Sequence, residues 1–240
     1  MIQKMIIYFF DFFKHNYKIY IIIFADYIFD MTKTNNDIFD NGKKLPLVEQ
    51  FYTVQGEGYY MGKPAYFIRV GGCDIGCSWC DTKFSWNPDF HKLESVDNII
   101  NKAKKLNVDT FVVTGGEPTT YDLNYLSEKL SENNILKHIE TSGVYKLTGK
   151  WDWVCLSPKK HNSPLNDIFT LANELKVIIS DESDFLWAEK NSKRVNSSCK
   201  LFLQPEWSKF EHIIPIIVDY VKNNPKWRIS LQAHKFMHIP

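Results

Sequence analysis

Short apolar runs alternate with helical stretches from about residue 65 to the end of the chain, and this alternation constrains the fold more than any other feature. The apolar runs have the length and β-branched content of strands, and the stretches between them repeat apolar residues at helical spacing. Strands that alternate with helices indicate an α/β fold, a parallel sheet with crossover helices. We predict strands at Ala65–Val70, Thr110–Thr114, Lys137–Thr141, Trp153–Ser157, Leu175–Ile179, Lys200–Gln204 and Arg228–Gln232, and helices at Glu94–Leu106, Asp122–Asn133, Phe185–Lys190 and Lys209–Asn223.

Polar motifs follow most of these strands at the point where each one ends. In parallel strands the carboxyl ends meet at one edge of the sheet, and active sites of barrels and open α/β sheets assemble there. We therefore expect the motifs to share one pocket. They are Gly71-Gly72-Cys73, Gly115-Gly116-Glu117-Pro118, Glu140-Thr141-Ser142-Gly143, Ser157-Pro158-Lys159, Gln204-Pro205-Glu206 and Gln232-Ala233-His234-Lys235.

The overall charge excludes some classes of partner. The chain has 240 residues, a hydrophobic content of 44% and a net charge of +1. This composition is enough for a sizeable core, and it gives no strong field that would favour nucleic acid or a membrane surface. We predict neither nucleic-acid binding nor membrane association.

The first thirty residues differ from the rest of the chain. They are rich in Ile, Phe and Tyr, but Asp11, Lys14, Lys18 and Asp26 interrupt them. No uninterrupted apolar run approaches the roughly 20 residues of a membrane-spanning helix, and no signal-peptide cleavage site follows clearly. We predict that residues 1–30 are an upstream extension outside the functional domain. The alternative is a peripheral membrane or partner-binding helix.

Three of the five cysteines lie within eight residues, with the spacing Cys73-x3-Cys77-x2-Cys80. Thiolates are soft ligands that suit iron–sulfur clusters, zinc and copper(I). Three ligands on a four-iron four-sulfur cluster leave one iron open to another molecule. The remaining two, Cys155 and Cys199, fall on predicted strands, where a cysteine is usually a small buried apolar residue. This usage favours a reducing, cytoplasmic compartment.

Two other metal sites compete with this interpretation. A structural zinc site needs four ligands, and His91 or His161 could supply the fourth. A ferredoxin-like electron carrier would need a fourth cysteine nearby, whereas Cys155 and Cys199 are distant in sequence.

The residues around the cysteines resemble a known superfamily. An aromatic residue, Trp79, precedes Cys80, and Gly115-Gly116-Glu117-Pro118 stands at the next strand end. Both features resemble the radical S-adenosylmethionine (SAM) superfamily. The resemblance implies an incomplete (β/α) barrel in which SAM chelates the fourth iron of the cluster through its amino and carboxylate groups. It also implies that the Gly-Gly-Glu-Pro turn faces the SAM amino group.

Flanking motifs narrow the resemblance to one family. They are Phe51 to Gly58, Cys80 to Phe84 and Trp227 to Pro240. Together they resemble the 7-carboxy-7-deazaguanine synthases over about residues 46–240, which we predict to be the catalytic domain. The resemblance implies a carbon–nitrogen lyase of queuosine-precursor (7-deazapurine) biosynthesis. It would convert 6-carboxy-5,6,7,8-tetrahydropterin to 7-carboxy-7-deazaguanine and release ammonia. Because SAM supplies the radical, no side chain is singled out as catalytic.

The same resemblance assigns residues to ligands. Magnesium is expected as a further cofactor with Thr82 as a ligand; the alternative is that Thr82 only caps the loop. For Arg69, expected at the substrate carboxylate, the alternative is a surface ion pair. The expected substrate residues are Val54, Gln55, Gly56, Glu57, Arg69, Thr114, His234 and Pro240, the last through its terminal carboxylate. The expected SAM residues are Gly116, Glu140, Ser142, Ser157, Pro158, Lys159, Lys176, Gln204, Pro205, Glu206 and Trp207.

Family members also suggest partners: a flavodoxin or ferredoxin as electron donor, and a second copy of the chain in a homodimer. Three alternative functions remain at this point. A glycyl-radical-activating enzyme would share the cysteine spacing but lack the Gln55–Gly58 motif and the ending from His234 to Pro240. An iron–sulfur or zinc module would use the metal only structurally. A related scaffold could have lost its activity, although every matched position is present.

Overall fold

The computed structural model describes residues 39–240. Within this range, Asn41–Pro240 form one compact unit. The predicted extension at residues 1–30 lies outside the described residues.

A single sheet organises the described part of the chain, in the order β3-β1-β2-β4-β5-β6-β7-β8-β9. In this order, each strand from β2 to β9 runs parallel to the next one. β1 is antiparallel to both of its neighbours, β2 and β3. The sheet curves without closing on itself, which confirms the expected incomplete barrel. The strands are β1 Lys44–Val54, β2 Pro64–Val70, β3 Leu93–Ser95, β4 Thr110–Gly115, β5 Leu136–Thr141, β6 Trp153–Leu156, β7 Glu174–Ile179, β8 Lys200–Pro205 and β9 Trp227–Ile229.

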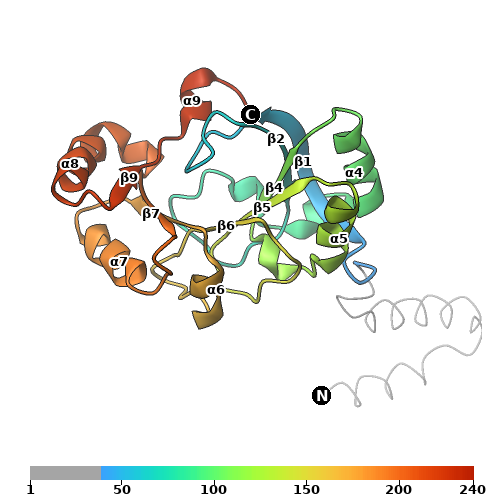
Figure 1. Cartoon of the computed structure of the whole chain (residues 1–240), viewed down its shortest axis with the longest axis horizontal. Helices are drawn as coiled ribbons and strands as arrows, with labels where there is room; N and C mark the ends of the chain where they lie inside the picture. The colour runs from blue at the N-terminus through green and yellow to red at the C-terminus, as the bar shows by residue number, and fades with distance from the viewer. Residues whose placement is uncertain (1–38) are drawn as a thin grey trace, which may run out of the picture. The chain divides into compact units, whose positions relative to one another are not determined.

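The helices that lie between strands in the sequence cover the outside of the curved sheet (Figure 1). They bury their apolar stripes against the strands, as α4 illustrates. Ser95 caps its N-terminus by accepting a hydrogen bond from the Asn98 N–H at 3.2 Å, and Ile99, Ile100 and Ala103 are buried on one face. The helices are α4 Val96–Lys104, α5 Asn124–Glu132, α6 Asn166–Leu171, α7 Ser183–Ser192, α8 Phe210–Asn223 and α9 Ala233–Met237.

All seven predicted strands are present, and the two strands without a prediction are the antiparallel pair β1 and β3. β1 contains Pro46, Glu49 and Gln50, which hide the apolar alternation typical of a strand. The predicted strand at Arg228–Gln232 ends early, at Ile229. Just beyond this end, the Ser230 hydroxyl accepts a hydrogen bond from the Gly58 N–H and donates one to the Gln204 side chain.

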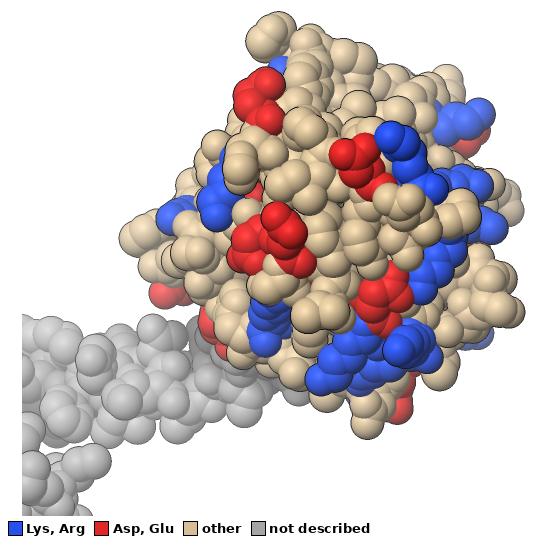
Figure 2. Space-filling model, turned by 90° about the vertical axis from the view of Figure 1, so that its left-hand side faces the viewer, with Lys and Arg blue, Asp and Glu red and all other residues tan. Residues whose placement is uncertain are grey.

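The surface agrees with the balanced charge of the sequence. On the face drawn in Figure 2, basic and acidic side chains are interspersed, and neither sign covers the face alone. Among the described helices, none is both long and apolar enough to span a membrane.

Candidate active site

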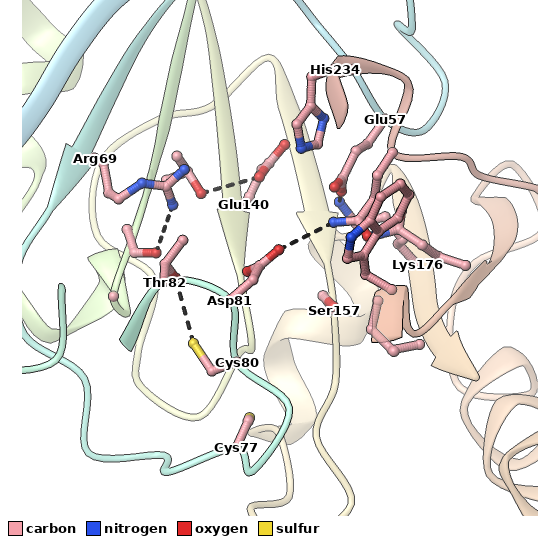
Figure 3. A pocket seen from close by; sticks show the side chains of 18 of the residues that line it. Glu57, Arg69, Cys77, Cys80, Asp81, Thr82, Glu140, Ser157, Lys176 and His234 are labelled. Atoms are coloured by element: carbon pink, nitrogen blue, oxygen red, sulfur yellow. Dashed lines mark hydrogen bonds and ion pairs between the residues drawn. The ribbon is translucent and has the colours of Figure 1, made fainter. Parts of the chain in front are cut away.

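A cavity of about 480 Å³ occupies the inside of the curved sheet. This volume lies within the range of roughly 300–1,000 Å³ that is usual for small-molecule sites. Residues of β1, β2, β4, β5, β7 and β8 line it, together with the cysteine loop and the C-terminal segment. Labelled side chains from these elements point into the same space in Figure 3.

The cysteine loop connects β2 to the short helical turn at Lys83–Ser85, and Cys73, Cys77 and Cys80 all line the cavity. Gly72 (φ +102°) and Gly76 (φ +72°) allow the loop to fold back sharply because glycine tolerates positive φ. Burial raises the pKa values of the Cys73 and Cys77 thiols, and Lys159 partly offsets this at Cys77. A bound metal would favour the thiolates instead.

The donor set of this loop fits a multi-iron cluster. In residues 39–240, no three His, Cys, Asp or Glu side chains converge as ligands of one metal ion. A four-iron cluster does not need such convergence, because each thiolate binds a different iron. His161, a candidate fourth ligand for zinc, lies 3.8 Å from the Cys77 sulfur and 2.8 Å from the Ile75 carbonyl oxygen. His91 instead contacts the Phe84 carbonyl oxygen at 3.0 Å.

The Gly115-Gly116-Glu117-Pro118 turn packs directly against the end of β2. A Cβ atom on Gly116 would lie 2.1 Å from the Gly72 carbonyl oxygen, so only glycine fits there. The buried Glu117 carboxylate accepts hydrogen bonds from the hydroxyls of Thr119, Thr141 and Ser142 and from the Ser142 N–H. These bonds join the ends of β4 and β5 beside the cysteine loop.

The remaining strand ends place further polar groups on the same side. Lys159 donates to the Ser157 hydroxyl at 2.7 Å and lies 5.3 Å from the centre of the Trp79 ring, so the turn after β6 contacts the cysteine loop. Burial lowers the pKa of Lys159. At the end of β8, the Gln204 side chain accepts a bond from the Ser230 hydroxyl, and Glu206 caps the turn at Trp207–Lys209.

A second group of polar residues surrounds the Glu140 carboxylate. The Gln55 amide donates to one Glu140 carboxylate oxygen at 3.0 Å, and the Thr114 hydroxyl donates to the other at 3.1 Å. From the family resemblance, Glu140 is expected at SAM and its two partners at the substrate. The geometry groups the three side chains together.

Gln55 and Glu57 reach this position from the end of the sheet at which the parallel strands begin. Because β1 is antiparallel to β2, its last residue, Val54, pairs with Pro64 at the start of β2. The Glu57 carboxylate forms an ion pair with the Lys176 ammonium, and both side chains are largely buried. Burial acts against both charges, but their attraction outweighs it. The pKa of Glu57 is lowered, and that of Lys176 is raised well above its ordinary value.

Arg69 projects from β2 into the cavity. Its Nε donates to Glu49 at 2.7 Å, and Nη1 donates to the Gly115 carbonyl oxygen at 3.1 Å. The ion pair that was the alternative for this residue is therefore present, and Arg69 also lines the cavity. Figure 3 shows Arg69 and Lys176 on opposite sides of the pocket, with Glu140 between them in that view.

The C-terminal segment closes the side of the barrel that the sheet leaves open. The Ala233 N–H donates to the Gly56 carbonyl oxygen at 2.9 Å, and a Cβ on Gly56 would lie 2.3 Å from His234 Nδ1. Lys235 forms an ion pair with Asp81 of the cysteine loop at 2.6 Å. Burial lowers the pKa of His234.

Thr82 does not cap the helical turn that follows it, because its side chain makes no capping hydrogen bond. Its hydroxyl instead lies 3.5 Å from the Cys80 sulfur and faces the cavity.

The cavity contains every predicted site residue except Pro158, which is buried behind the turn between Ser157 and Lys159. Asp81, Gln232 and Lys235 also line the cavity, and although each lies within a motif of the sequence, none of them was predicted to contact a ligand. The apolar residues Phe67 and Trp86 also line the cavity but could not be predicted, because nothing in the sequence distinguishes them from core residues. The predicted residues in the cavity are Val54, Gln55, Gly56, Glu57, Arg69, Cys73, Cys77, Cys80, Thr82, Thr114, Gly116, Glu140, Ser142, Ser157, Lys159, Lys176, Gln204, Pro205, Glu206, Trp207, His234 and Pro240.

Comparison with known proteins agrees with this geometry. The model of the radical SAM superfamily matches residues 67–154. A 7-carboxy-7-deazaguanine synthase of Flavobacterium psychrophilum is 53% identical over 88% of this chain and 100% of its own length. The synthase of that name from Synechocystis is 42% identical over 81% of this chain and 93% of its own. The crystal structure of QueE from Escherichia coli matches with a TM-score of 0.72 and 28% identity, over 84% of this chain and 100% of that one.

The partial barrel, its cysteine loop and the superfamily match define a radical SAM enzyme. Membership of this superfamily implies a four-iron four-sulfur cluster and SAM as cofactors. At the identities found, the chain belongs to the 7-carboxy-7-deazaguanine synthase family. The class and family expected from the sequence are thereby confirmed.

Proposed function

We propose that this enzyme converts 6-carboxy-5,6,7,8-tetrahydropterin to 7-carboxy-7-deazaguanine with release of ammonia, as a step of queuosine-precursor biosynthesis. The observation that carries the proposal is the division of one cavity into two polar groups. The cysteine loop and the turns after β4, β6 and β8 form one group, and Gln55, Thr114, Glu140 and Arg69 form the other.

The first group is our proposed cofactor side. Cys73, Cys77 and Cys80 would hold the cluster, and the chemistry that SAM would supply when bound there is the formation of a radical. The buried Glu117 keeps the β4 and β5 ends together through its bonds to Thr141 and Ser142. The SAM-side residues are Gly116, Ser142, Ser157, Lys159, Gln204, Pro205, Glu206 and Trp207, and the buried Pro158 shapes the turn that carries two of them.

The second group is our proposed substrate side, and it includes Glu140. A pterin presents a row of N–H donors, and a carboxylate can accept hydrogen bonds from them. Gln55 and Thr114 hold the two Glu140 carboxylate oxygens in place. Arg69 offers its guanidinium to the substrate carboxylate. Val54, Gly56 and Glu57 border the substrate, Lys176 stabilises Glu57, and His234 and Pro240 close the cavity from the C-terminal side.

We further propose that Thr82 binds Mg²⁺ next to the cluster, since a hydroxyl oxygen suits this hard cation. A flavodoxin or ferredoxin as electron donor, a homodimer and a cytoplasmic location follow from the family resemblance. The free state of all five cysteines fits a reducing compartment. Residues 46–240 act as the catalytic domain in this proposal.

The test is an anaerobic assay of the iron-reconstituted protein with SAM, Mg²⁺, a reductant and the pterin, read by mass spectrometry. Formation of 7-carboxy-7-deazaguanine by the wild type, and its loss in Cys77→Ala, supports the proposal. If 5′-deoxyadenosine forms without that product, the substrate assignment is wrong. If neither species forms from protein with a full cluster, the proposed activity is wrong altogether.

A further inference from the structure

Glu174 is a buried carboxylate outside the cavity described above. It is the first residue of β7, and only 3% of its surface is exposed. It lines a second, much smaller space of about 10 Å³ on the other side of Gln55 and Glu57. The expected ligand contacts therefore give no reason for a carboxylate at this position.

The hydrogen bonds of Glu174 show what it holds. One carboxylate oxygen accepts from the Tyr59 backbone N–H and from the Trp153 indole N–H, both at 3.1 Å. The other oxygen lies 3.6 Å from the Cys155 sulfur. A buried carboxylate costs free energy unless such partners satisfy it, and these partners fix the start of the turn after β1 to the starts of β6 and β7.

The turn at Gly58 and Tyr59 packs directly against the Glu174 carboxylate. Gly58 has φ +65°, and a Cβ atom there would lie 2.0 Å from a Glu174 oxygen. The Gly58 N–H donates to the Ser230 hydroxyl at 2.9 Å, and the Tyr59 ring stacks on Trp153 with centroids 5.0 Å apart. The backbone at Gly58 and Tyr59 is thus clamped between the strand starts and the C-terminal segment.

The clamp acts on residues that line the main cavity. Directly before it, Gln55 donates to Glu140, and Glu57 pairs with Lys176. A shift of the turn by about 1 Å would move both side chains together, and such a displacement can cost a hundredfold in rate.

We propose that Glu174 is a positioning residue that holds the Gln55–Gly58 turn in its substrate-binding conformation. The proposal rests on the proposed function, because that function gives Gln55 and Glu57 their role at the substrate. In this role, Glu174 fixes the position of the turn by accepting hydrogen bonds from two N–H groups, those of Tyr59 and Trp153.

A different role for Glu174 would be to balance the buried Lys176 charge. Glu57 and Glu140 also act on Lys176, and burial raises the pKa of Glu174 itself. The substitution Glu174→Gln separates the two roles. Its carbonyl oxygen can accept from Tyr59 and Trp153, and its amide can face the Cys155 sulfur, but it carries no charge. Glu174→Ala removes both the charge and the acceptors.

Hydrogen exchange of the full-length, cluster-loaded protein gives a readout that needs no turnover. We expect Glu174→Ala to increase amide exchange in a peptide covering Gln55–Tyr59 at least tenfold, and Glu174→Gln to keep it within threefold of the wild type. The matched control is Glu189→Ala. Glu189 accepts bonds from Tyr220, Lys226 and Trp227, and it does not line the cavity. The Glu189→Ala substitution should leave amide exchange in the Gln55–Tyr59 peptide unchanged.

Steady-state kinetics complete the test. Glu174→Ala should raise the KM for the pterin at least tenfold and leave both SAM affinity and pterin-independent 5′-deoxyadenosine formation within twofold. Glu174→Gln should restore the KM. Unchanged exchange and KM in Glu174→Ala would overturn the proposal, as would equal losses in both variants. A wild type that forms no 7-carboxy-7-deazaguanine would refute the proposed function instead, and the exchange data would still decide whether Glu174 holds the turn.

Discussion

The Glu57 carboxylate and the Lys176 ammonium form an ion pair inside the barrel, between the turn after β1 and the middle of β7. Their contact joins the turn that follows β1 to the parallel strands of the described sheet. The pair is buried, so each charge depends on the other.

Removal of one partner should therefore destabilise the protein strongly. We expect Lys176→Met to lower the free energy of unfolding by about 3–5 kcal/mol, because it leaves the Glu57 charge buried and unpaired. The double variant Glu57→Gln/Lys176→Met should recover much of this loss. Anaerobic urea unfolding of the three proteins measures it. A single variant as stable as the wild type would show that the pair is not buried as described.

The sequence was sufficient to predict the parallel strands and most of the cavity, because most of the parallel strands end in a recognisable polar motif. It did not predict β1, whose residues Pro46 and Glu49 break the apolar pattern. For this reason the position of Gln55 and Glu57 relative to Lys176 was not foreseen. Pairing across long sequence separations, such as Gln55 with Glu140 or Asp81 with Lys235, also depends on how the strands are ordered.

The Thr82 hydroxyl should be a ligand of Mg²⁺. Thr82→Ala should raise the Mg²⁺ concentration for half-maximal product formation by at least about tenfold, because one oxygen ligand is lost. Thr82→Ser keeps the hydroxyl and should stay near the wild type. The iron content of all three proteins serves as the control, since Thr82 also lies 3.5 Å from the Cys80 sulfur. Equal Mg²⁺ dependence in all three would remove Thr82 from the metal site.

The C-terminal segment should be intolerant of extension. Ile239 and Pro240 line the cavity, so residues added after Pro240 would displace the segment that His234 and Lys235 anchor. We expect a six-residue extension to lower kcat/KM for the pterin at least about tenfold and to leave the cluster absorbance unchanged. The same six residues placed before Met1 provide the comparison. Full activity of the C-terminally extended enzyme would contradict this placement.

His138 should make the protein less stable in acid. Burial lowers its pKa from 6.5 to about 4, and the ring packs 4.6 Å from Tyr60. Between these two values the unfolded chain binds a proton that the folded protein does not, so stability falls as the pH drops. Between pH 7 and pH 5, the wild type should lose about 2 kcal/mol relative to His138→Phe. Urea unfolding at both pH values measures the difference, and parallel curves for the two proteins would refute the low pKa.

The ratio of 7-carboxy-7-deazaguanine to free 5′-deoxyadenosine tests the central claim most directly, namely that one cavity joins a cofactor side to a substrate side that includes Glu140. The measurement compares the cluster-loaded wild type with Glu140→Ala under anaerobic conditions. We predict that the wild type forms product with little free 5′-deoxyadenosine, and that Glu140→Ala forms 5′-deoxyadenosine with almost no product. Product formation by Glu140→Ala at the wild-type rate, or none by the wild type, would contradict the account.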